Sequence, residues 1–110
     1  MGALARSGPY TAQAPLAIVV VVERTKFAVA DASRAIQSMI LAAWAEGVGS
    51  NWVGFMGLEE VKKLLRVPAD KDVLAILPFG YPAAALGRGK KKRQSLAAVA
   101  SKERFGEPYE

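Results

Sequence analysis

The chain has 110 residues, 52% of them hydrophobic, and contains neither cysteine nor histidine. Its length predicts one domain, its apolar content excludes a disordered chain, and the missing cysteines exclude disulfides. The missing histidines exclude catalytic schemes built on a Ser-His or Cys-His pair, and most zinc sites. Any chemistry must therefore come from a cofactor, or from lysine, tyrosine and carboxylate side chains.

The net charge of +5 comes from a single segment. Residues 88–93 hold five basic residues and no acidic ones, and without them the net charge is zero. The N-terminus lacks the apolar stretch of a signal peptide, and Leu16–Val22 is too short to cross a bilayer. Together with the absence of cysteine, these features predict a soluble, cytoplasmic protein.

The first half of the chain predicts one strand and one long helix. Residues 1–14 show no periodicity and are expected to form a loose lead-in. Leu16–Glu23 is a continuous run of mostly β-branched residues, which is typical of a strand buried on both faces. Asp31 stands where a helix N-cap belongs, and Ala32–Glu46 has apolar residues at helical spacing. The second half of this helix is apolar nearly all round, so we expect it to end in the core or in a subunit interface, with Gly47 as its cap.

A glycine-rich turn leads into the second half of the chain. Trp52–Phe55 predicts a short strand and Leu58–Arg66 a second helix, with acidic residues first and basic residues later, as the helix dipole favours. Asp72–Phe79 predicts another buried strand, and Pro78 within it indicates the edge or end of a sheet strand. A loop with the basic residues follows, and Ser95–Arg104 predicts a short helix capped by its serine. This order predicts an α+β fold, a mixed sheet packed against helices, with residues 15–110 as a single domain.

The turn and strand at residues 47–55 form the first candidate binding motif. Three glycines in Gly47–Gly54 permit tight turns and the close approach of a flat ligand to the backbone. They follow a helix instead of a strand, so this is not a dinucleotide-binding fingerprint. The plain alternative is a helix cap followed by a loop.

The basic run at residues 88–93 is the second candidate. Lysine and arginine side chains suit a phosphate group, the first as a point charge and the second as a two-pronged donor. A solvated loop and a surface for nucleic acid or another acidic partner are the alternatives. No aromatic residue is interleaved with the run, so a platform for stacking bases is missing.

Taken in order, these pieces resemble the C-terminal half of the FMN-dependent nitroreductase family. An apolar helix that begins at an Asp ends in a Gly-x-Gly-Ser turn, and Trp-Val-Gly follows. Then come a Glu-rich helix with a Pro behind it, an apolar strand ending in Gly-Tyr-Pro, and a basic segment. The resemblance implies FMN at the interface of a homodimer, with NAD(P)H as hydride donor and a nitroaromatic or quinone as acceptor in a ping-pong cycle.

The resemblance also implies site residues. Trp52, Val53, Gly54 and Phe55 would lie against the flavin ring, largely through the backbone, and Lys91 and Arg93 would hold the FMN phosphate. The repeated lysines leave the register open by one position, so Lys90 and Lys92 remain candidates for the phosphate.

The family's Arg-rich motif on a first helix has no match in this sequence, which corresponds to about half of a usual subunit. The sequence therefore leaves three readings open: an FMN-dependent oxidoreductase or its flavin-binding half, a silent relative that serves as an interaction or assembly module, and an anion- or nucleic-acid-binding protein that uses the basic run. In the first two cases we expect a homo-oligomer or a complementing chain as partner.

Overall fold

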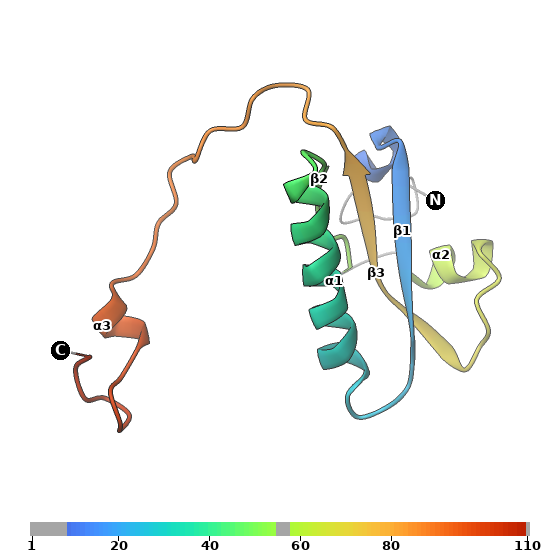
Figure 1. Ribbon diagram of the computed structural model, residues 1–110. Helices are drawn as coiled ribbons and strands as arrows, with labels where there is room; N and C mark the ends of the chain where they lie inside the picture. The colour runs from blue at the N-terminus through green and yellow to red at the C-terminus, as the bar shows by residue number, and fades with distance from the viewer. Residues whose placement is uncertain (1–8, 55–57, 110) are drawn as a thin grey trace.

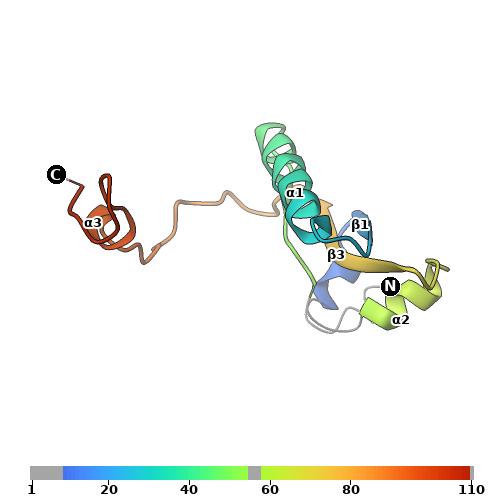
Figure 2. The ribbon, with the colours of Figure 1, turned by 90° about the horizontal axis from the view of Figure 1, so that it is seen from below.

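The computed structural model describes residues 9–54 and 58–109. Its elements, in chain order, are η1 (Pro9–Gln13), β1 (Leu16–Glu23), α1 (Ala28–Ala45), β2 (Gly49–Ser50), α2 (Leu58–Leu64), β3 (Lys71–Gly80) and α3 (Leu96–Val99). The sheet stands between α1 on one face and α2 on the other, while the chain after β3 leads away to α3 (Figures 1 and 2). The α+β class predicted from the sequence is confirmed.

The sheet has the order β1-β3-β2, and both pairings are antiparallel, where a mixed sheet was expected. Strand β1 occupies the predicted residues, and β3 exceeds its predicted range by one residue at each end. The β1–β3 register shifts between Val20, opposite Ala75, and Val21, opposite Val73, so that Leu74 forms a bulge.

Pro78 lies inside the central strand, two residues before its end, and not at an edge. Its carbonyl accepts a hydrogen bond of 3.3 Å from the backbone N–H of Asn51, just past the end of the short β2. A proline removes one donor from the ladder. Here the missing donor falls opposite Asn51, between the Ser50–Phe79 pair and the Val53–Ile76 bridge, so the pairing on this side of the strand is interrupted at one position and then resumes.

The core consists of two clusters, one on each face of the sheet. Side chains alternate along β3, so that Ile76 faces α2 while Ala75 and Leu77 face α1. Val61 joins the cluster under α2 and Ile36 the cluster under α1, and both are fully buried. Strand β3 is thus buried on both faces, as its apolar run indicated. Strand β1 is not, because it lies at the edge of the sheet and all of its residues are partly or largely exposed.

Helix α1 begins four residues before its predicted start, with Phe27 as N-cap. Asp31 is therefore not the cap, because its N–H is bonded to the Phe27 carbonyl (2.9 Å) inside the first turn. The other end follows the prediction. The N–H groups of Gly47 and Val48 bond to carbonyls of the last turn, with Gly47 at φ +78°, which is the Schellman arrangement.

The outer face of α1 is apolar and open. Leu41 and Trp44 are both more than half exposed, whereas Ile36 on the inner face is fully buried. The helix therefore does not end deep in the core of a single chain, and the interface alternative is the one that its exposure favours. None of the helices within the described ranges is long and apolar enough to cross a membrane.

The C-terminal segment lies apart from the sheet. The predicted helix Ser95–Arg104 is reduced to the four residues of α3, and the Ser95 side chain makes no capping hydrogen bond. Leu96, Val99 and Phe105 are each at least 60% exposed. A short helix whose apolar side chains stay mostly exposed gains little packing energy, which accounts for its early end.

Candidate functional site

The segment predicted to contact a ligand runs beside the central strand. The N–H of Val53 donates to the Ile76 carbonyl (2.9 Å), and the Ile76 N–H donates to the Val53 carbonyl (2.7 Å). The Val53 side chain is 1% exposed in the cluster under α2. The predicted strand Trp52–Phe55 is thus one antiparallel bridge that continues β2, and Phe55 lies outside the described residues.

Hydrogen bonding within this segment decides which backbone donors are open to a ligand. The Trp52 N–H donates to Oδ1 of Asn51 (2.8 Å), and the Val53 N–H serves the sheet. The N–H of Gly54 has no acceptor among the residues that the structure describes. A partly buried donor without an acceptor is ready to bind the polar edge of a ligand.

The indole of Trp52 folds over Gly54. A Cβ atom at Gly54 would come within 2.6 Å of the indole Nε1 and within 3.1 Å of the Leu74 carbonyl oxygen. Only glycine leaves the indole in this position, so the glycine is required by its close neighbours. The arrangement offers a donor and a flat aromatic side chain together, which suits a planar, polar ring.

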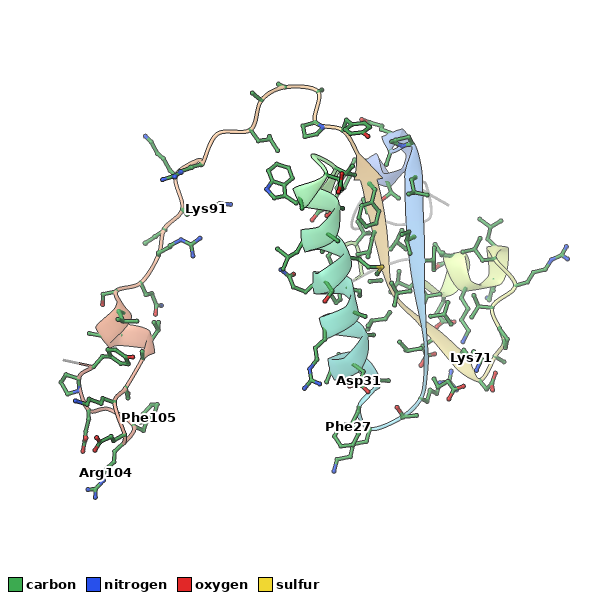
Figure 3. The ribbon with its side chains drawn as sticks, in the orientation of Figure 1. Phe27, Asp31, Lys71, Lys91, Arg104 and Phe105 are labelled. Carbon is green, nitrogen blue, oxygen red and sulfur yellow. The ribbon has the colours of Figure 1, made fainter. Side chains whose placement is uncertain are left out.

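The basic residues lie elsewhere. All of residues 88–93 are exposed, in a stretch without helix or strand, as the predicted loop requires. Lys91 lies on the extended segment, apart from the sheet and from α1 (Figure 3). Arg93 follows two residues later, and neither side chain forms an ion pair within the described ranges. The structure therefore does not bring Lys91 and Arg93 to Gly54 within one copy of the chain.

The lead-in takes part in the site, which the sequence did not predict. Residues 9–13 form the short helix η1 and are not a loose stretch, and Thr11 is buried. Tyr10 accepts a hydrogen bond (2.5 Å) from Nδ2 of Asn51, the residue whose Oδ1 binds the Trp52 N–H. Asn51 thus links the lead-in to the binding segment. An asparagine in a glycine-rich turn carries no sequence signal for this role.

A second polar cluster lies near the start of β3. Arg24 donates from Nε and Nη2 to the two carboxylate oxygens of Asp72, at 3.0 Å each. These hydrogen bonds, then the charge of Arg24, hold the pKa of Asp72 below its usual value. Lys71 donates to Glu23 at 3.0 Å, and this hydrogen bond raises the pKa of Lys71.

Comparison with known proteins gives consistent matches. The family model described as "Nitroreductase family" matches residues 5–81. A protein from Methanothermobacter thermautotrophicus with the name "Putative NADH dehydrogenase/NAD(P)H nitroreductase" is 33% identical over 85 residues, which are 69% of this chain and 44% of the relative.

Solved structures agree in fold. A protein of the same name from Bacteroides thetaiotaomicron matches with a TM-score of 0.70 and 31% identity, over 84% of this chain and 60% of the other. A nitroreductase with bound FMN from Bacteroides fragilis matches with a TM-score of 0.64 and 26% identity, over 84% and 54%. The chain thus spans roughly half of the relatives that it matches.

Proposed function

This chain belongs to the nitroreductase family, and we propose that it forms the flavin-binding part of an FMN-dependent NAD(P)H oxidoreductase. The open N–H of Gly54, beside the Trp52 indole, carries the proposal, because it lies within the matched residues 5–81. The proposed acceptors are nitroaromatics or quinones. A cytoplasmic location belongs to the proposal, and the absence of cysteine agrees with such a reducing compartment.

The donors of the chain fit FMN in kind. The Gly54 N–H would donate to the polar edge of the flavin ring. The indole of Trp52, which lies against Gly54, would fix the backbone that carries this N–H. Val53 would hold the segment against the sheet through its buried side chain. Phe55, which lies outside the described residues, belongs to the proposed contact by its place in the sequence. Bound FMN would supply the two-electron chemistry, for which this chain has no histidine or cysteine of its own.

The phosphate contacts imply a second chain. Lys91 and Arg93 are charged donors without partners in the described ranges, as a phosphate site needs. Because the extended segment carries them away from their own sheet, we propose that they reach the flavin of a partner copy or of a complementing chain (Figure 3). The exposed apolar residues on this segment and on α1 would then be covered in a homodimer.

The first test is an FMN titration followed by flavin fluorescence. The double substitution Lys91→Glu and Arg93→Glu is expected to weaken FMN binding at least about tenfold, because charge-assisted hydrogen bonds to the phosphate are lost. Lys102→Glu with Arg104→Glu is the matched control, since it makes the same charge change at the same spacing in the same exposed tail. Equal affinities in the two double variants would refute the phosphate assignment.

A mixing experiment tests whether two copies share one site. Variant one carries Lys91→Glu and Arg93→Glu, and variant two carries Gly54→Leu. If Gly54 and the basic residues of a site come from different copies, each variant alone loses FMN binding, while each mixed dimer regains one intact site. No recovery on mixing, from variants shown to form mixed dimers, would place all the contacts in one copy.

The open apolar surface also favours a second candidate, an assembly module without flavin. Leu41 and Trp44 on α1 are more than half exposed, and Phe105 is fully exposed. A folded oligomer that neither binds FMN nor oxidises NAD(P)H would support this function. Steeply salt-dependent binding of an oligonucleotide would point to the basic run instead.

A further inference from the structure

A pocket of about 320 Å³ lies between α2, the turn that follows it and the chain just after β1. It is separate from the Gly54 donor and shares no lining residue with that segment. Its lining residues are Arg24, Glu59, Lys62, Lys63, Val67 and Ala69. Four of the six are charged, and three of these, Arg24, Glu59 and Lys63, are exposed, so the pocket is a polar hollow that opens to solvent.

One wall of the pocket holds a buried lysine. The Lys62 side chain is 9% exposed, and its Nζ lies 3.3 Å from the Ala69 carbonyl oxygen and 3.5 Å from Oδ1 of Asp72. Lysine is almost never fully buried unless it is paired. Asp72 must also serve Arg24, so a single carboxylate faces two cations. The charges of Arg24 and Lys62 are therefore only partly neutralised by Asp72, and this wall carries excess positive charge.

Two cationic groups in the lining still have donors to offer. Asp72 occupies Nε and Nη2 of Arg24 and leaves Nη1 without a partner among the described residues. The Lys63 ammonium has no ion-pair partner there either. A guanidinium fork with an ammonium group nearby is a suitable donor set for an oxyanion.

An acidic group is also available. Glu59 lies one helical turn before Lys63, at a spacing that often forms an ion pair, yet the two are not within ion-pair distance. Glu59 and Asp70 both act electrostatically on Arg24. A simple anion would be repelled by these carboxylates, whereas a ligand that also carries a positive group would not.

We propose that this pocket binds a small zwitterion, in which an oxyanion and an ammonium group stand a few bonds apart. Arg24 and Lys63 receive the oxyanion, Lys62 adds its charge from the wall, and Glu59 receives the ammonium group. This site requires neither FMN nor a dimer, so it can be tested independently of the proposed function.

The test follows the backbone amides of residues 59–69 by NMR during titrations. The probes are O-phosphoethanolamine, whose oxyanion is a phosphate, glycine, whose oxyanion is a carboxylate, and inorganic phosphate, which lacks the ammonium group. At least one zwitterion is expected to shift these amides in a saturable way. The zwitterion that binds more tightly shows whether the pocket prefers a phosphate or a carboxylate. Shifts confined to residues 88–93 would contradict the proposal.

Two substitutions separate the roles, with Lys102→Gln as control for general charge. Lys63→Gln is expected to weaken the binding of the zwitterion about tenfold, the effect of losing one charge-assisted hydrogen bond. Glu59→Gln is expected to weaken the binding of the zwitterion but not the binding of inorganic phosphate. Both side chains lie on the surface of α2, so the fold should persist. Affinity unchanged in Lys63→Gln, or a Glu59→Gln effect equal for both probes, would overturn the proposal.

Discussion

The close contact between Gly54 and the Trp52 indole makes a quantitative prediction. In Gly54→Ala the new Cβ would lie 2.6 Å from Nε1 and 3.1 Å from the Leu74 carbonyl oxygen. Both distances are shorter than a van der Waals contact, so the indole must rotate and the backbone must shift. Overpacking of this kind costs about 1–3 kcal/mol of unfolding free energy. Gly87→Ala is the control, since its Cβ would meet nothing within 4 Å, and we expect a change within about 0.5 kcal/mol.

A double-mutant cycle isolates the cause. Trp52→Leu removes the 2.6 Å contact and keeps an apolar side chain, so that Gly54→Ala in this background meets only the Leu74 carbonyl oxygen and should cost below about 1 kcal/mol. Urea denaturation followed by far-UV circular dichroism gives all four free energies without relying on tryptophan fluorescence. Costs that add within error would show that the indole does not determine the need for glycine at residue 54.

Four further predictions concern stability, each measured by urea denaturation. Gly47→Ala should cost about 1 kcal/mol, because alanine is strained at φ +78°. Arg66→Gly should raise the free energy of unfolding by about 0.5 kcal/mol, because Arg66 lies in the turn just after α2 at φ +56°, where glycine is unstrained. Changes of the same sign in Gly47→Ala and Arg66→Gly would contradict this reasoning. Ile76→Ala empties a fully buried position and should cost about 2–5 kcal/mol. Since Arg24 lowers the pKa of Asp72, their pair stabilises the protein above pH of about 4 and is lost as the pH falls further. Asp72→Asn should flatten this acid dependence, and an unchanged slope would refute it.

The strands could be predicted because their signal is local. Leu16–Glu23 matches β1 at both ends, because its unbroken run of apolar, mostly β-branched residues up to Val22 favours an extended strand even at the edge of the sheet. The start of α1 was missed because Asp31 is a good cap, yet residues 28–30 contain no helix breaker and extend the helix. The tail helix was overestimated because its pattern says nothing about whether a surface exists for it to pack on.

The sequence singled out the segment of the candidate site but not the contacts within it. The glycines at residues 47–54 marked the segment, and the structure shows a glycine that is required at residue 54. Nothing local indicated that Asn51 would occupy the Trp52 N–H or that Tyr10 would bind Asn51 from 41 residues away. Arg24 and Asp72 are 48 residues apart in the sequence. Their ion pair could be predicted only if the β1–β3 register were already known.

Strand β1 has a consequence for handling the protein. Within the described residues it pairs only with β3, so its other edge presents unbonded backbone groups along eight residues. Its middle is four consecutive valines, and the nearest charges are Glu23 and Arg24 at one end. Such an edge is a template for strands of other molecules. We expect concentrated samples to form intermolecular β-structure with a lag phase that Val21→Lys, at an exposed position, lengthens. The protein would then stay unaggregated longest in dilute solution, or when a partner covers the open edge of β1.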